Sequence, residues 1–245
     1  MILTRYNTIL AILLFFVPTV ASSATISLTD LYYRSWNGII THDVGASTST
    51  FEVMSSSTGA IGPVVETNST SYASAYGSSD YLDLYAFSSV DSTNINQLGY
   101  DYAIAEATTQ FEADMQITGG AGNVLLNIDA FYNQNITSDV NTFISGEQRI
   151  RIYDDTNSLI FAYLHGVSNP SILDEIALEF DAMYRFTMSS TAYTKADFGS
   201  IASNEREFSA SLNASAVPLP GALILFLSGL SVMLIKPLSV SRKST

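Results

Sequence analysis

The residues that could carry out chemistry in this chain are few and widely separated. There are two histidines, His42 and His165, and no cysteine. Neither histidine has a metal-ligand spacing, so we interpret each as a surface or loop residue. The absence of cysteine removes thiol nucleophiles, thiolate zinc sites and disulfides together. No nucleophile motif, phosphate-binding loop or dinucleotide fingerprint is present. We therefore predict no catalytic, cofactor-binding or metal-ligating residue.

Carboxylates are plentiful and allow two other kinds of site. Two carboxyl groups at glycosidase separation could hydrolyse a glycan, although acidic residues spread singly along alternating strands usually form a solvated face. The run Asp154-Asp155-Thr156-Asn157 offers the oxygen ligands that calcium prefers. It lacks the regular acidic spacing and the distant Glu of an EF-hand loop. We expect no cofactor, with calcium at this run as the alternative.

One aromatic cluster lies near the start of the chain. Tyr32-Tyr33-Arg34-Ser35-Trp36 contains the only tryptophan. Exposed rings of this kind can stack on sugars, but such clusters more often form a hydrophobic corner of the core. The two interpretations differ in one observable, which is whether the rings face solvent or the interior.

The charge of the chain excludes one class of partner. All 23 acidic residues but only six basic ones lie in residues 25–216, which leaves this segment a formal charge of −17. Such a surface repels nucleic acid and anionic lipid headgroups. No basic patch is present, so we exclude nucleic-acid binding. The length of the segment suits one domain with a real core.

The pattern of this domain predicts strands rather than helices. In residues 111–118 apolar side chains alternate with polar ones, and four residues rich in glycine follow at 119–122. Period two and a glycine turn indicate a β-hairpin whose second strand is 123–132. A second hairpin is predicted from 147–153 and 158–164, joined by the Asp154 run.

Further strands are predicted by the same alternation. In 81–87 we expect Leu82, Leu84 and Ala86 on one face and the rings on the other. Residues 176–188 read as one long strand, and 205–212 as the last, followed by a short tether at 213–216. Shorter strands are expected at 25–33 and 50–54 and within 67–79. The fold class is therefore all-β, an antiparallel β-sandwich with a jelly-roll-like arrangement as first choice.

The N-terminus has the order of a secretory signal peptide. Arg5 is the only charged residue before Asp30, residues 9–17 are an unbroken apolar run, and small residues lead to Ala24. We predict export through the Sec machinery and cleavage after Ala24, with Ala21 as the alternative. The apolar run is too short to span a bilayer as a helix.

The C-terminus has the order of a membrane anchor. Residues 221–235 are apolar apart from two serines, and Pro218 and Pro220 precede them. Counted from Val217 the segment is just long enough to span a bilayer as a transmembrane helix. A basic stop follows at Lys236, Arg242 and Lys243, which favours the cytoplasmic side and leaves the domain outside.

These residues resemble a known sorting signal. Val217-Pro218-Leu219-Pro220, the run at 222–226 and Ser228-Gly229-Leu230 are similar to the VPLPA variant of the PEP-CTERM signal of Gram-negative bacteria. The resemblance covers roughly the last thirty residues and implies recognition by an exosortase, a membrane-embedded transpeptidase, at or near the proline motif. It implies nothing about the domain before it.

The sequence thus predicts three segments: a signal peptide (1–24), a β-sandwich ectodomain (25–216) and a sorting signal (217–245). We expect a non-enzymatic protein, anchored in the inner membrane before processing and then found at the cell surface or outside the cell. Expected partners are the exosortase and, by family association, extracellular polysaccharide. The alternative is a carbohydrate-binding module or glycan-active enzyme on the same scaffold.

Overall fold

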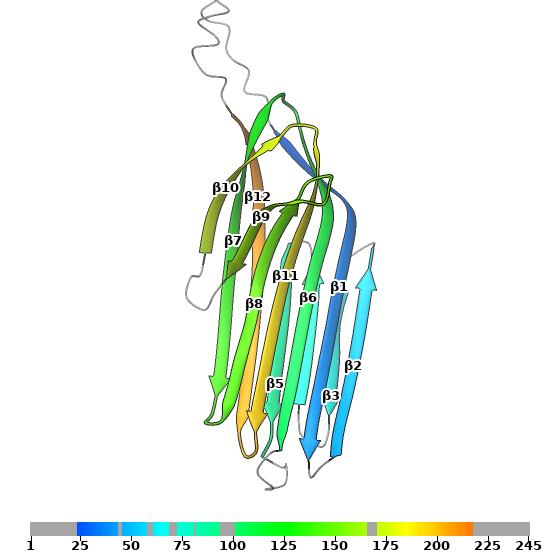
Figure 1. Ribbon diagram of the computed structural model, residues 1–245, viewed down its shortest axis with the longest axis vertical. Helices are drawn as coiled ribbons and strands as arrows, with labels where there is room; N and C mark the ends of the chain where they lie inside the picture. Colours follow the sequence, from blue (N-terminus) through cyan, green and yellow to red (C-terminus); the bar gives the residue numbers. More distant parts are fainter. Residues whose placement is uncertain are drawn as a thin grey trace, which may run out of the picture. The chain divides into compact units, whose positions relative to one another are not determined.

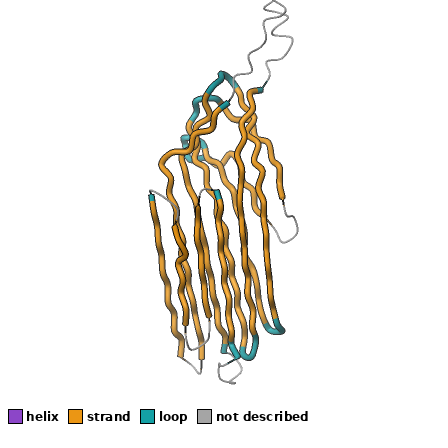
Figure 2. Tube along the Cα trace, turned by 180° about the vertical axis from the view of Figure 1, so that it is seen from behind, coloured by secondary structure: helices purple, strands orange, loops and turns teal. Residues whose placement is uncertain are grey.

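The described part of the chain consists of β-strands and the turns between them. The computed structural model describes residues 24–43, 46–57, 61–68, 73–80, 82–93, 101–165 and 171–217, and Figure 2 shows no helix among them. The strands are β1 (Thr25–Asp43), β2 (Ala46–Ser56), β3 (Ile61–Asn68), β4 (Ala73–Asp80), β5 (Asp83–Asp91), β6 (Tyr102–Thr118), β7 (Asn123–Ser138), β8 (Thr142–Tyr153), β9 (Leu159–His165), β10 (Ser171–Glu179), β11 (Met183–Asp197) and β12 (Ile201–Ala216).

The strands form two six-stranded antiparallel sheets. Sheet A has the order β2-β1-β6-β11-β8-β9, and sheet B the order β10-β7-β12-β5-β4-β3. Figure 1 looks onto sheet A, with β5 and β3 of sheet B behind it. The all-β, antiparallel prediction is confirmed. The expected jelly-roll-like arrangement has eight strands in two Greek keys, whereas this domain has two six-stranded sheets. We therefore describe the fold by its strand order.

The two sheets face each other because their strands alternate apolar and polar residues. In β6 every second residue from Ala103 to Ile117 is buried, and those between, Thr108 excepted, are half-buried. Hydrogen bonds cross between the sheets inside: Ser88 Oγ and Thr194 Oγ1 are 2.6 Å apart, and Asn204 Nδ2 donates to the Ser145 carbonyl at 2.7 Å. These side-chain hydrogen bonds between the inner faces hold the two sheets in one position relative to each other.

The hairpin expected at residues 111–132 is wrong. Both strands exist, but β6 pairs with β1 and β11, whereas β7 belongs to sheet B. Gly119 and Gly122 have positive φ values of 98° and 80°, so the glycine turn is present but crosses from one sheet to the other. Alternation cannot separate the two cases, because the inner faces of both sheets are apolar.

The long strand expected at 176–188 is also wrong. It breaks into β10 in sheet B and β11 in sheet A, with Asp181 at a φ of 62° between them. The amides of Phe180 and Asp181 donate to the carbonyls of Gly122 and Ile117 at 3.0 and 2.8 Å. The segment that connects β6 to β7 and the segment that connects β10 to β11 are therefore hydrogen-bonded to each other at one end of the sheets.

The remaining strand predictions are mostly confirmed. The β8–β9 hairpin pairs in register from Gln148 opposite His165 onward, and Leu84 and Ala86 in β5 are buried as expected. β1 extends far beyond residue 33. The expected tether at 213–216 is wrong, because β12 continues as strand through Ala216.

The interior has two zones of different chemistry. The alanine zone is a fully buried cluster of small and branched apolar residues: Ile39, Ala86, Val90, Ala103, Ala105, Ala107, Ala192, Ala196 and Ala202. The arginine belt is a set of buried polar residues: Arg206, Asn204, Gln148, Ser190 and His165. Arg206 is one of the six basic residues of 25–216 whose charges the sequence analysis assigned to the surface.

Candidate functional site

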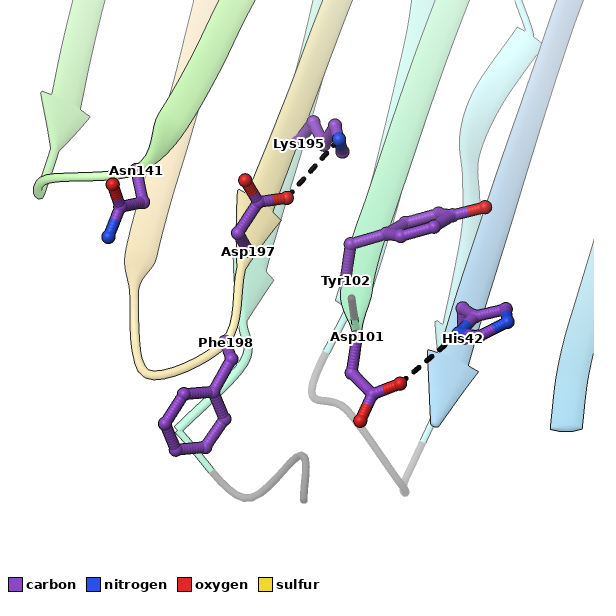
Figure 3. A pocket seen from close by; sticks show the side chains of 7 residues that line it. All are labelled: His42, Asp101, Tyr102, Asn141, Lys195, Asp197 and Phe198. Carbon is purple, nitrogen blue, oxygen red and sulfur yellow. Dashed lines mark hydrogen bonds and ion pairs between the residues drawn. The ribbon is translucent and has the colours of Figure 1, made fainter. Parts of the chain in front are cut away.

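The candidate site is a hollow at one end of sheet A. It has a volume of about 670 Å³ and is lined by His42 from β1, Asp101 and Tyr102 at the start of β6, Lys195, Asp197 and Phe198 at the end of β11, and Asn141. Figure 3 shows these side chains around the strand ends. They come together because β6 pairs with β1 on one side and β11 on the other: Tyr102 is opposite both His42 and Asp197.

The ionisable groups of the hollow are paired with one another. His42 Nδ1 lies 3.2 Å from Asp101 Oδ1, and the Asp101 side chain is only 3% exposed. Lys195 Nζ lies 3.2 Å from Asp197 Oδ1. Both contacts are drawn as dashed lines in Figure 3. The hollow therefore holds two acids and two bases, each engaged by the other kind.

The Tyr102 ring of the hollow is already in contact with its neighbours. The His42 and Tyr102 rings are stacked, with centroids 5.4 Å apart and planes 12° apart. Lys195 Nζ lies 4.9 Å from the Tyr102 ring centroid, a cation–π distance. A sugar that used this ring would have to displace one of them.

Backbone hydrogen bonds hold the lining residues in place. The Asp197 amide donates to the Asn141 carbonyl and the Phe198 amide to the Asp101 carbonyl, each at 3.0 Å. The buried Ser92 hydroxyl is 2.6 Å from the Asp197 carbonyl and 2.7 Å from that of Ser200. The Ser92 hydroxyl thereby links the end of β11 in sheet A to the start of β12 in sheet B. The positions of the lining residues are therefore set by the fold.

The aromatic cluster predicted near the start of the chain is divided between the two faces of β1. Tyr33 is 2% exposed and packs on Phe111, with ring centroids 5.1 Å apart. Tyr32 and Trp36 point the other way, onto the outer face of sheet A. Arg34 lies between them with its guanidinium 5.0 Å from the Trp36 ring centroid. Only part of the cluster belongs to the core, and the outward tryptophan is covered by a cation.

The outer faces of the two sheets differ in charge. The strand register puts five of the six basic residues of 25–216 on the outer face of sheet A: Arg34, Arg149, Arg151, Arg185 and Lys195. The described outer face of sheet B carries carboxylates and no basic residue: Asp83, Asp91, Asp129, Glu175, Glu179, Glu205 and Glu207. The outer face of sheet A also carries five carboxylates, so its charges balance: Glu106, Glu112, Asp114, Glu147 and Asp197. A cationic partner would therefore meet sheet B rather than sheet A.

Burial changes the acidity of two groups on the sheet A face. Desolvation raises the pKa of the Glu106 carboxyl above its usual value. Glu106 lies between Gly38 and Tyr193 in the register, and desolvation also raises the pKa of the Tyr193 hydroxyl. The Glu106 carboxyl is not one of the groups that line the hollow.

The acidic turn considered for calcium is occupied by its own hydrogen bonds. Asp154 Oδ1 accepts from the amides of Thr156 and Ser158 and from the Thr156 hydroxyl. These bonds hold the pKa of Asp154 below its usual value, the Thr156 hydroxyl most of all. Arg185 donates to Asn157 Oδ1 and contacts Glu112 at 3.7 Å. A cation is therefore already present at this turn.

The structure corrects the interpretation of His165. Sequence analysis placed both histidines at the surface or in loops, but His165 is 3% exposed at the end of β9. Its Nδ1 lies 2.8 Å from the Tyr163 hydroxyl, and its ring is 3.9 Å from that of Tyr132. His42 is partly exposed but lies within β1. Desolvation, and secondarily the charge of Arg206, lowers the pKa of His165.

Arg206 is the buried residue that sequence reasoning missed. It is 2% exposed, and its Nε and Nη1 donate to Asn204 Oδ1 and Gln148 Oε1 at 3.1 and 3.3 Å. Burial lowers the pKa of the guanidinium, which nevertheless keeps its charge. The alternation of the strand could have predicted its burial, because residues two apart in a strand point to the same face and Arg206 is two residues before the buried Phe208.

The predicted sorting residues lie mostly outside the described part of the chain. Ala24 and Val217 are described, and Val217 is 40% exposed. Pro218, Leu219, Pro220 and the basic stop at Lys236, Arg242 and Lys243 lie outside it. Within the described residues no helix has the length and apolar character to cross a membrane, and no cluster of three or more His, Asp or Glu is placed to hold a metal. The expected span at 221–235 is also outside.

Comparison with known proteins gives no family. No family model matches the chain, and no curated protein matches it. It is similar to the enzymatically active domain of bacteriophage CBA120 tailspike protein 4 at a TM-score of 0.23 and 13% identity, over 54% of this chain and 18% of that chain. A structure of infectious bursal disease virus, Gt strain, gives a TM-score of 0.16 and 9% identity, over 87% of this chain and 74% of that one. At such scores neither likeness bears on fold or function.

Proposed function

We propose that this chain is an exported, non-enzymatic protein of the cell surface or extracellular matrix, with a β-sandwich ectodomain that an exosortase retains or transfers. The observation that carries the proposal is the order of its segments. A signal peptide ending at Ala24 precedes an acidic, cysteine-free domain. Val217-Pro218-Leu219-Pro220 then precedes an apolar run and a basic tail.

The geometry of the hollow supports the non-enzymatic part of this proposal. A general acid or base must reach a substrate proton in the correct protonation state. Asp101 and Asp197 are the two carboxylates of the hollow, and each is held by a basic partner at 3.2 Å. Opening the site would require breaking both contacts. The His42–Asp101 contact is better explained as a link between the end of β1 and the start of β6, and the Lys195–Asp197 contact as a pair within β11, than as a catalytic arrangement.

The experiment that tests export and sorting is the intact mass of the protein recovered from the native cell surface or medium. We expect a chain that begins after Ala24 and ends near Val217 to Pro220, with or without an attached group. A variant with Pro218→Ala and Pro220→Ala should retain the tail and accumulate in the membrane fraction. A natural product of residues 25–245 would reduce the tail to a plain anchor.

A second candidate function is non-catalytic binding of extracellular polysaccharide on the outer face of sheet A. Phe51 and Phe143 are 65% and 59% exposed on that face, which also carries the exposed cations. Exposed rings and charged groups together suit sugar recognition. The sheet B face has the exposed ring of Phe131, at 54%, and provides a matched control.

Binding can be tested with neutral and uronic-acid oligosaccharides measured by calorimetry. Phe51→Ala and Phe143→Ala should each weaken binding by about tenfold, since loss of one stacked ring corresponds to about 1–1.5 kcal/mol, and Phe131→Ala should not. Equal effects of all three variants, or no binding to any probe, would eliminate this candidate. Release of new reducing ends during incubation would instead establish the glycan-active enzyme as the correct alternative.

A further inference from the structure

Each sheet of the domain ends in two edge strands. In sheet A these are β2 and β9, and in sheet B they are β10 and β3. An edge strand presents unpaired backbone amides and carbonyls, which can pair with an extended segment of another chain. Proteins usually prevent this with charges, proline, bulges or a covering element. The four edges differ sharply in such protection.

Three of the edges are protected. β3 contains Pro63, which has no amide hydrogen, and its register shifts between Ile61 and Val64. β10 carries Asp174, Glu175 and Glu179 in nine residues. β2 carries Glu52 and contacts β3 of the other sheet. Each of these edges therefore resists pairing with a further strand.

The fourth edge, β9, has no charged residue and no proline, and its one register shift is confined to its first residues. Its sequence, Leu-Ile-Phe-Ala-Tyr-Leu-His, contains no acidic, lysine, arginine, proline or glycine residue. Leu159, Ile160 and Leu164 are 52%, 41% and 59% exposed. The ladder to β8 is regular from Phe161 to His165, with one register shift before it. Short uncharged segments of high β-propensity at an edge are those that pair between chains.

We propose that β9 pairs antiparallel with β9 of a second copy of this chain, across a two-fold axis at Ala162. Sheet A of each copy would then continue into the other. The strand is self-complementary about this axis: Ile160 faces Leu164 of the second copy on the outer side, and Phe161 faces Tyr163 of the second copy on the inner side. A two-fold interface requires such self-complementarity.

Charge favours a second copy at this edge. The domain carries a formal charge of −17, so most of its surface repels an identical molecule. β9 is uncharged, and Arg149 and Arg151 lie opposite Leu164 and Ala162 on the neighbouring β8. Arg149 is paired with Glu147, and Arg151 reduces the local repulsion. The association does not depend on how the chain is exported or sorted.

The absence of cysteine gives a direct test. Directly opposed residues of an antiparallel pair have Cβ atoms roughly 4.5–5.5 Å apart, close enough for a disulfide with a small adjustment. The full chain with Ala162→Cys should form a disulfide-linked dimer under mild oxidation. The control is Val53→Cys, at a 43% exposed residue of β2, the edge strand at the other side of sheet A. It should form at least tenfold less disulfide-linked dimer. Equal cross-linking of the two folded variants would overturn the proposal.

A charge-swap experiment tests the register without cross-linking. In sedimentation of the full chain we expect a dimer for the natural sequence and a monomer for Ala162→Lys and for Ala162→Glu, because each puts like charges opposite one another. An equimolar mixture of the two variants should recover the dimer. A monomeric natural chain, or single variants that dimerise as tightly as it does, would overturn the proposal. A mixture that stays monomeric would overturn the two-fold register.

Discussion

The alanine zone and the arginine belt are both closed to water, but they stabilise the domain in different ways. In the alanine zone, seven of the nine fully buried residues are alanines, five of them from β6 and β11, and none of the nine carries a polar side chain. Small side chains let two sheets approach closely, and the stabilisation is spread over many contacts of low individual energy. No single residue dominates this zone.

The arginine belt instead depends on one side chain. Asn204 and Gln148 use their amide oxygens to accept from Arg206, and Gln148 lies opposite His165 in the β8–β9 register. A buried charge is costly unless its hydrogen bonds are satisfied. The arginine belt therefore stabilises the fold only when all of its hydrogen bonds are formed, and loss of one of its members destabilises the fold. The comparison predicts that mutations in the belt have larger and more strongly coupled effects than conservative changes in the alanine zone.

The largest effect is expected for Arg206→Ala. The variant leaves a cavity and removes the donor to two buried amide oxygens, so we expect a loss of about 3–5 kcal/mol in the free energy of unfolding. Urea denaturation followed by circular dichroism measures this. Arg206→Met fills the volume without the charge and should cost less than half as much. A loss below about 1 kcal/mol for the alanine variant would show that the belt is not organised around Arg206.

The next effect is expected for Gly146→Ala. A Cβ at this position would lie 2.2 Å from the Thr191 carbonyl oxygen and 2.5 Å from Arg206 Nε. Backbone must therefore move, and we expect a loss of about 2 kcal/mol, measured by the same urea denaturation. Gly62→Ala is the matched control, since no atom lies within 4 Å of the position that its methyl group would take.

In a double-variant cycle, Gly146→Ala should couple to Arg206→Met, because the two sites share a contact. Removing the guanidinium relieves one of the two clashes, so the double variant should be less destabilised than the sum of the single ones. Strict additivity would mean that only the Thr191 contact matters, and the belt would then not extend to Gly146.

Alternation in the sequence predicts most strands of this fold and the direction of many side chains. Leu84, Ala86 and Phe208 are buried as the pattern requires. The same parity puts Arg206 inside, but its charge argued for the surface, and parity was the better guide. One amide oxygen that supports Arg206 comes from Asn204 on the same strand, but the other comes from Gln148 in the opposite sheet, and that partner is distant in sequence.

The pattern cannot tell which sheet a strand joins. Gly119 and Gly122 end one strand and begin another equally well in a hairpin or in a crossing between sheets, because both inner faces are apolar. The hollow could not be found for a related reason. His42 and Asp101 meet only through the register of β1 with β6, and no local signal in the sequence specifies that register.

A smaller effect is expected for Ala105→Val in the alanine zone. Two added carbon atoms must fit where the alanine is fully buried, so we expect a loss of about 1 kcal/mol from overpacking. Ala177→Val on the exposed face of β10 is the control and should change stability by less than about 0.5 kcal/mol. A loss as large as that of Arg206→Ala would remove the distinction between the two zones.

The smallest effect concerns the pH dependence of the belt. Burial, and secondarily Arg206, lowers the pKa of His165 in the folded state. The unfolded chain therefore binds a proton below about pH 6.5 where the folded chain does not, and stability falls as the pH decreases from there toward the folded pKa. The urea midpoint should drop less on acidification in His165→Gln than in the natural protein, whereas His42→Gln, which changes the partly exposed histidine of the hollow, serves as comparator. An identical drop in the natural protein and in His165→Gln would show that the belt does not sense pH through this residue.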